Sequence, residues 1–255
     1  MRRLFPVSPV GEADSLDTLD ALADAYAYPA PRGAASAWLR GNMVASLDGA
    51  ARHDGRSQPL SSAADMRIFG VLRGLADAVV VGAETVRQEE YRPAKAREAF
   101  AERRAALGQP VAPVIAVVSA SLDLDFSLPL FTEPLVPTLV LTGAQADPDR
   151  VRAARARGAE VVVAGAGAGV EPAEAVRALA ARGLTRLLTE GGPRLLAQFA
   201  ATGVLDELCL SIAPLVAAGT APRIMDGPGL DVPARFAPAA ILEEDGFLFT
   251  RYVRA

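Results

Sequence analysis

The sequence of 255 residues contains one cysteine, Cys209, and one histidine, His53. A single cysteine excludes an internal disulfide and a cysteine-based zinc site, and a single histidine excludes a histidine-rich centre, so we expect no metal. Hydrolases built on a Ser-His-Asp or Cys-His arrangement are disfavoured because His53, in the polar turn Ala51–Arg56, is the only histidine that could serve as base. The G-x-x-x-x-G-K-[ST] pattern of a P-loop is also missing.

Long apolar runs and clusters of one charge are absent too. Hydrophobic residues make up 51% of the chain, yet no uninterrupted run approaches the roughly 20 residues of a membrane helix. The segment Met1–Val7 has two arginines but no apolar stretch long enough for a signal peptide. The net charge of −4 is spread over interspersed signs, which argues against nucleic acid as the principal partner. We therefore expect a cytoplasmic protein that binds neither membranes nor nucleic acid.

The chain divides near residue 37. Residues 1–37 have the character of an N-terminal extension: helical spacing of leucines predicts a helix over Asp14–Tyr26, and Tyr28–Gly33 then forms a linker. We expect this extension to pack across the outside of the domain or against a partner subunit. Residues 38–255 form the main domain.

Strand-like and helix-like segments alternate through the main domain. Strands are expected at Trp38–Ser46, Ala78–Val81, Val114–Val118, Thr138–Leu141, Glu160–Val163, Arg186–Thr189, Glu207–Ile212 and Phe247–Val253. Helices are expected at Ser62–Leu75, from Glu84 onward, and at Pro148–Arg157, Pro172–Arg182 and Pro193 to about Ala201. The alternation predicts an α/β fold in which helices flank a mostly parallel central sheet with an antiparallel edge near the C-terminus.

The most informative segment is Glu190-Gly191-Gly192-Pro193, where an apolar strand gives way to a helix. The glycines allow a ligand to approach the backbone, and the unpaired N–H groups of the helix start suit a phosphate. Glu190 stands where a strand ends, which is where open α/β sheets bind ligands. The same segment is also compatible with a plain strand-to-helix turn and a solvated glutamate.

Two further strand ends carry related signals. Gly82 follows the apolar strand Val79–Val81 and precedes a short helix, so both strand–glycine–helix junctions could converge on one pyrophosphate. Asn42 and Val44 lie two residues apart and therefore share one face of the first strand. The turn former Asp48-Gly49 follows this strand. Two junctions of this kind in one sheet favour a nucleotide site.

These motifs stand in the order and spacing of a known family: Ser46–Gly49, Ser57–Ser62, Leu72-Arg73, Gly82–Val86, Glu190–Pro193 and Val204–Leu208. Over residues 38–253 the chain resembles the reductase domain of the bifunctional riboflavin-biosynthesis deaminase/reductase, a fold similar to dihydrofolate reductase. The zinc signature of the deaminase half is absent. The resemblance implies a homodimeric, NADPH-dependent reductase that converts 5-amino-6-(5-phosphoribosylamino)uracil to its ribitylamino product.

The resemblance also implies roles for individual residues. Cofactor contacts are expected at Val44, Pro59, Ser61, Thr85, Glu89 and at Gly191, Gly192, Pro193, Arg194, Leu195 and Leu196, beside the junction residue Gly82. Substrate contacts are expected at Asn42, Ser57, Arg73, Arg92 and Glu190. In these roles Glu190 holds a sugar hydroxyl, and Arg73 or Arg92 meets the substrate phosphate.

Two questions stay open at the level of the sequence. The proton that accompanies the hydride could come from Glu190, Asp48 or an ordered water, although Asp48 could equally cap its own turn. Asn42 replaces a lysine that is common in the family. Its presence leaves open a dihydrofolate or dihydropterin reductase of the same fold as an alternative function. A relative that binds a nucleotide or a partner protein without turnover is a third alternative, which the intact Glu190-Gly191-Gly192-Pro193 turn disfavours.

Overall fold

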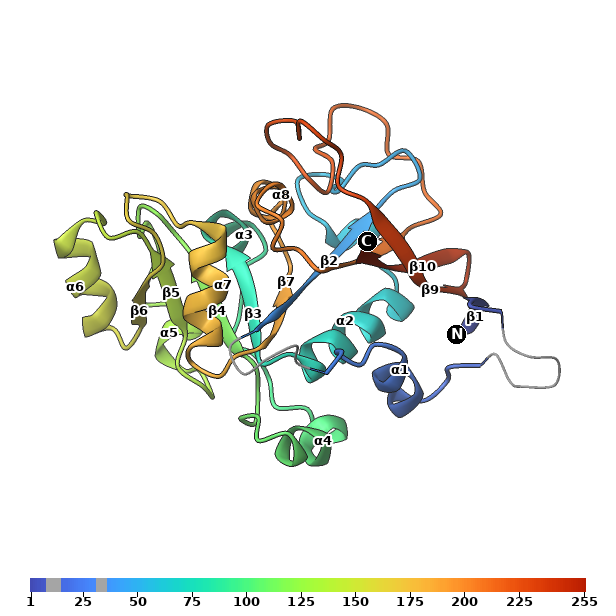
Figure 1. Cartoon of the computed structure of the whole chain (residues 1–255), viewed down its shortest axis with the longest axis horizontal. Coiled ribbons are helices and arrows are strands. Elements are labelled where there is room, and N and C mark those ends of the chain that lie inside the picture. Colours follow the sequence, from blue (N-terminus) through green and yellow to red (C-terminus); the bar gives the residue numbers. More distant parts are fainter. Residues whose placement is uncertain (8–14, 31–35) are drawn as a thin grey trace.

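The computed structural model describes residues 1–7, 15–30 and 36–255 (Figure 1). Asp14 and Pro31–Gly33, the ends of the expected helix and linker, lie outside the described residues. Within the described part of the chain no helix is both long and apolar enough to cross a membrane.

One sheet of ten strands runs through the described residues, in the order β1-β9-β10-β8-β2-β7-β3-β4-β5-β6. The strands are β1 (Arg2–Phe5), β2 (Trp38–Ala45), β3 (Ala78–Gly82), β4 (Val114–Val118), β5 (Leu139–Thr142), β6 (Glu160–Val163), β7 (Arg186–Thr189), β8 (Glu207–Ile212), β9 (Phe236–Glu244) and β10 (Phe247–Arg254). From β8 to β6 every neighbouring pair is parallel, whereas β10, β9 and β1 add an antiparallel edge. The expected α/β class, with its antiparallel C-terminal edge, is confirmed.

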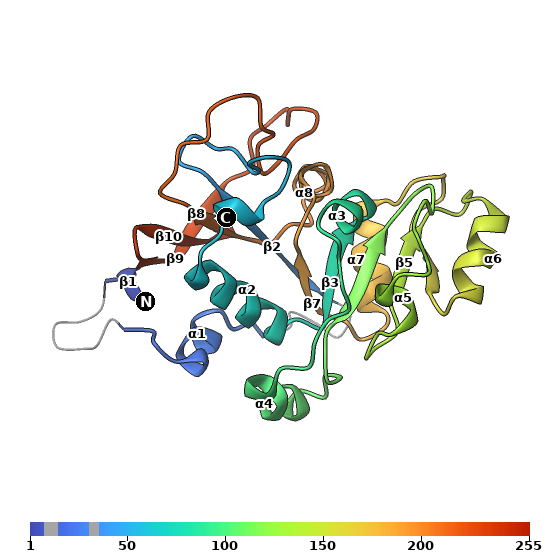
Figure 2. The same ribbon diagram turned by 180° about the vertical axis from the view of Figure 1, so that it is seen from behind.

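Helices cover both faces of this sheet (Figures 1 and 2). They are α1 (Leu19–Ala25), α2 (Ala63–Leu75), α3 (Ala83–Gln88), α4 (Ala101–Ala106), α5 (Pro129–Thr132), α6 (Pro148–Ala156), α7 (Pro172–Ala180) and α8 (Pro193–Ala201), with short 3₁₀ turns at Gln58–Leu60 and Glu98–Phe100. The helix predicted from Ser62 is confirmed, and the Ser62 hydroxyl caps it by accepting the N–H of Asp65 at 3.1 Å. Helix α1 begins at Leu19, later than expected, because the Thr18 hydroxyl caps its start by accepting the N–H of Ala21.

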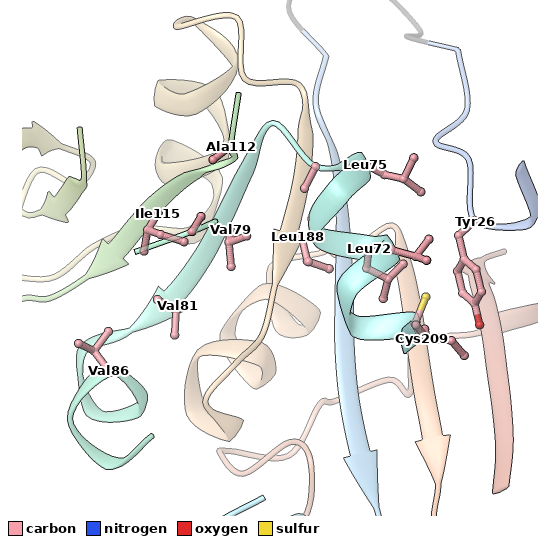
Figure 3. Close-up of a cluster of buried hydrophobic side chains, with 14 of the residues drawn as sticks. Tyr26, Leu72, Leu75, Val79, Val81, Val86, Ala112, Ile115, Leu188 and Cys209 are labelled. Carbon is pink, nitrogen blue, oxygen red and sulfur yellow. The ribbon is translucent and has the colours of Figure 1, made fainter. Parts of the chain in front are cut away.

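Alternation along the strands builds two cores. On β3, Val79 and Val81 face the core beneath α1 and α2, whereas Ala78 and Val80 face the core beneath α7 and α8. Figure 3 shows the first of these cores, with Leu72 and Leu75 of α2 beside the sheet. The cores fix α2 and α8 on opposite faces of the central strands, so both helices reach the carboxyl ends of β2, β7 and β3.

A buried charge network joins the N-terminal segment to the sheet. Glu207 on β8 has no exposed surface and forms an ion pair with Arg40, whose Nε lies 2.8 Å from Oε1. It accepts hydrogen bonds from Arg40 Nη2 at 3.1 Å and from Arg251 Nε at 2.6 Å. Arg40 also donates to the carbonyl of Tyr26 at 2.8 Å, and Arg251 to that of Ala25 at 3.0 Å. Burial alone would raise the pKa of Glu207, but the two arginines outweigh it and hold that pKa below its usual value. The end of α1 is thereby tied to β2 and β10.

Candidate active site

The candidate site lies where β2, β7 and β3 end side by side, as expected for ligands of a parallel sheet. Here the two glycine junctions meet: Gly82 N–H donates to the carbonyl of Gly191 at 2.9 Å. A Cβ on Gly192 would lie 2.8 Å from Thr85 Oγ1, so the Thr85 hydroxyl faces this glycine directly. Gly191 has a φ of +83°, a conformation that favours glycine. The structure therefore brings the residues of both predicted junctions together.

Helix α8 starts at this meeting point with open N–H groups. Its cap is Gly192, which provides no side-chain cap, and Pro193 occupies the first turn. Leu195 and Leu196 are 8% and 0% exposed and pack into the core, so any ligand contact from them is through the backbone. Arg194 is exposed at the same turn.

A cavity of about 560 Å³ adjoins the junction. Met43 connects the two, because it lines the cavity and its sulfur is 3.2 Å from the position of a Cβ on Gly191. Eight predicted site residues line this cavity: Asn42, Val44, Ser57, Ser61, Arg73, Glu89, Arg92 and Glu190. Pro59 and Asp48 are not among its lining residues.

Glu190 and Arg73 form a two-pronged ion pair on the cavity wall. Arg73 Nε donates to Glu190 Oε1 and Nη2 to Oε2, both at 2.7 Å. The glutamate side chain is 6% exposed and the arginine 18%. Burial works against the charge on Arg73, but Glu190 outweighs it and raises the pKa of the guanidinium above its usual value. The pair joins α2 to the end of β7.

Tyr91 completes this group, although nothing in the sequence singled it out. Its hydroxyl donates to Glu190 Oε2 and accepts from Arg73 Nη2, the latter at 2.7 Å. The Arg73 guanidinium lies 4.3 Å from the ring centre of Phe69 and 5.1 Å from that of Tyr91. Along the sequence Tyr91 lies 18 positions from Arg73, and Glu190 lies 117 positions from it. At such separations the local sequence pattern gives no signal of a contact.

Glu89 holds Ser57, another residue of the cavity lining. Its Oε1 accepts the backbone N–H of Ser57 at 3.2 Å and the Ser57 hydroxyl at 3.1 Å. The carboxylate thus fixes a predicted substrate residue in place. Arg92, three residues on, is exposed.

Asp48 performs a different task from the cavity residues. Its carboxylate accepts the Ser46 hydroxyl, the N–H of Ala217 at 3.0 Å and the N–H of Ala218 at 2.7 Å. These hydrogen bonds lower the pKa of Asp48 to about 2, and the one from Ser46 has the largest effect. Asp48 lies outside the cavity lining, and its carboxylate joins its own turn to the segment at Ala217 and Ala218.

A known protein family covers most of this chain. The model of the RibD C-terminal domain family matches residues 37–244. The chain belongs to the RibD C-terminal domain family. Within the described fold, this match spans β2 to β9 and therefore every element that contributes to the site.

Relatives of this RibD-type chain include solved and curated proteins. The chain is 32% identical over 191 residues to the 2,5-diamino-6-ribosylamino-4(3H)-pyrimidinone 5′-phosphate reductase of Methanothermobacter thermautotrophicus, covering 74% of this chain and 84% of that protein. A pyrimidine reductase-like protein from Corynebacterium diphtheriae superposes with a TM-score of 0.77 at 30% identity, covering 86% and 92% of the two chains. RibD from Acinetobacter baumannii shares the fold with a TM-score of 0.68 at 17% identity, over 87% of this chain and 59% of that one.

Proposed function

We propose that this RibD-type chain is an NADPH-dependent reductase that converts the ribosyl group of a 6-ribosylaminopyrimidine 5′-phosphate into a ribityl group, a step of riboflavin synthesis. The observation that carries the proposal is the meeting of Gly82 with Gly191 beside the cavity that holds Arg73 and Glu190. A phosphate cradle and a sugar-binding ion pair are thereby contiguous.

The residues at the junction fit a dinucleotide. The cradle at Gly192 has no side chain, the Thr85 hydroxyl faces it, and the N–H groups at the start of α8 provide donors and a positive dipole end for a pyrophosphate. When bound, the dihydronicotinamide supplies the hydride. Val44 and Ser61, which line the cavity, are the proposed neighbours of that ring.

The cavity residues act on the sugar. Reduction adds a hydride to C1′ of the ribose, breaks the C1′–O4′ bond and requires a proton at O4′. Glu190 accepts a sugar hydroxyl and is held in one orientation by Arg73 and Tyr91. We assign the proton route to this group or to water beside it, because Asp48 is fixed to the Ala217 and Ala218 backbone. Arg92 is proposed to meet the phosphate from the exposed rim.

The pyrimidine itself has two candidate forms. The sequence resemblance predicts 5-amino-6-(5-phosphoribosylamino)uracil, which carries an oxo group at C2. The relative from Methanothermobacter thermautotrophicus is named for a 2,5-diamino compound, which carries an amino group there. The reduction at C1′ is the same for both.

One experiment tests the proposed activity. Purified protein is mixed with NADPH and, in separate reactions, with each pyrimidine riboside phosphate and with dihydrofolate, while NADPH absorbance is followed. We expect oxidation with a pyrimidine and none with dihydrofolate. Oxidation with dihydrofolate alone would replace the proposed substrate class, and the absence of NADPH binding would overturn the reductase assignment.

NADPH in preference to NADH and the homodimer are proposals that the family resemblance supports, and the cytoplasmic location is a further proposal. Titration with both nucleotides checks the first of them. Analytical ultracentrifugation checks the second, with a mass of one chain contradicting it. Fractionation of cells that express the protein checks the third.

A further inference from the structure

Asp65 is a buried carboxylate that receives no hydrogen bond from the described residues. It stands in the first turn of α2, is 6% exposed and lines the cavity. Its backbone N–H is used by Ser62, but among the described residues its carboxylate makes no hydrogen bond and no ion pair. Both oxygens keep access to solvent, and the cavity beside the residue provides it.

A buried carboxylate needs hydrogen-bond donors. Taking a charged group out of water costs free energy unless hydrogen bonds replace the lost water. Arg73, on the same helix, is already paired with Glu190, so it does not neutralise Asp65. The missing donors are therefore expected from whatever occupies the cavity.

The position of Asp65 along α2 indicates which part of a ligand it meets. Asp65, Phe69 and Arg73 follow one another at intervals of four residues, so they share one face of the helix, and all three line the cavity. The Cα atoms of the outer two are about 12 Å apart along the helix axis. A ligand whose sugar is held at the Arg73 and Glu190 end would place its heterocycle toward Asp65.

We propose that Asp65 recognises the base of the substrate by accepting two adjacent N–H groups, an exocyclic amino group and the neighbouring ring N–H, and so selects a 2-aminopyrimidinone over a uracil. An ionised carboxylate is an acceptor only, and two parallel N–H donors match its two oxygens. A C2 oxo group would instead place a second acceptor against the carboxylate. The inference rests on the proposed function and names the base that this function leaves open.

The test compares the two ribosylaminopyrimidine 5′-phosphates on the wild-type protein and on Asp65→Asn. Binding is measured by calorimetry without NADPH, and kcat/KM is measured with it. We expect the wild type to prefer the 2-amino compound by about 10- to 100-fold, the range for a charge-assisted hydrogen bond. Asp65→Asn offers one amide N–H to a C2 oxo group, so the preference shrinks or reverses.

A matched control separates recognition from helix stability. Asp149→Asn makes the same change in the first turn of α6, at an exposed site outside the cavity lining. A first-turn aspartate also favours the helix dipole, so both variants can lose some thermal stability. Only Asp65→Asn is expected to change the ratio of the two substrates.

The outcomes are distinct. Wild-type preference for the uracil compound, or an unchanged ratio in Asp65→Asn, overturns the inference and leaves the reductase function standing. Selective binding of the 2-amino compound without any NADPH oxidation supports the inference and overturns the proposed reduction. Binding of neither compound overturns both.

Discussion

Replacing Gly192 with aspartate is the sharpest perturbation of the proposed cofactor cradle. Gly192 has a φ of −63°, so its backbone accepts a side chain, and the new Cβ meets the Thr85 hydroxyl at 2.8 Å. The fold should therefore survive with a small shift of Thr85. The aspartate carboxylate, however, would point into the space assigned to a pyrophosphate.

The expected loss follows from Coulomb's law. Two unit charges about 4 Å apart repel by about 1 kcal/mol in bulk water and about 4 kcal/mol at an effective dielectric constant of about 20. Arg52 Nη2 lies 4.0 Å from the new Cβ and can pair with the carboxylate, which moderates the repulsion. An intermediate value of about 2.7 kcal/mol corresponds to about 100-fold weaker binding.

Gly192→Asn is the matched control, since it has the same size without the charge. Calorimetric titration with NADPH should give a Kd about 100-fold higher for the aspartate variant than for the asparagine variant, and the gap should narrow as salt is raised. Circular dichroism checks that both variants fold. Equal NADPH affinity in the two folded variants would falsify the placement of the phosphate.

Three further predictions concern other parts of the molecule. Glu190→Gln should lower kcat/KM for the pyrimidine by at least about tenfold, because Arg73 loses its charged partner. The affinity for NADPH should stay unchanged. A parallel loss of NADPH affinity would contradict the assignment of Glu190 to the sugar. The pKa of Asp48 is lowered from 3.8 to about 2, so its stabilising effect is complete above about pH 4 and is lost as the pH falls toward 2. The gap in melting temperature between wild type and Asp48→Asn should close over that interval, and a gap that is constant with pH would refute the role of its charge. Glu207→Leu should lower the free energy of unfolding in urea by about 3–5 kcal/mol, because it leaves Arg40 buried and unpaired; a loss below about 1 kcal/mol would show that the network contributes little.

The local pattern of the sequence was sufficient for the elements that build the centre of the fold. Val114–Val118 is a continuous apolar run and Arg186–Thr189 is centred on a pair of leucines, and the structure has both strands with the predicted bounds. Strand β9 was missed because its alanines and Pro238 give little strand signal. Asp245-Gly246, the hairpin turn between β9 and β10, was the usable clue.

The sequence predicted the site residues only where they belong to local motifs along the chain. Gly82 and Gly191 carry local turn chemistry, so their meeting could be anticipated from a parallel sheet. Tyr91 matters because it contacts Arg73 and Glu190, and Asp65 because it lines the cavity. Neither residue stands out in the sequence by its type or spacing. Tertiary packing decides such positions, and the structure was needed to find them.

The most direct test of the account follows the hydride itself. NADPH carrying deuterium at both C4 positions is incubated with the protein and the preferred ribosylaminopyrimidine 5′-phosphate, and the product is examined by mass spectrometry. We expect one deuterium at C1′ of a ribityl product for each NADPH oxidised. Oxidation of NADPH without deuterium at C1′, or no ribityl product from either pyrimidine, would contradict the central claim.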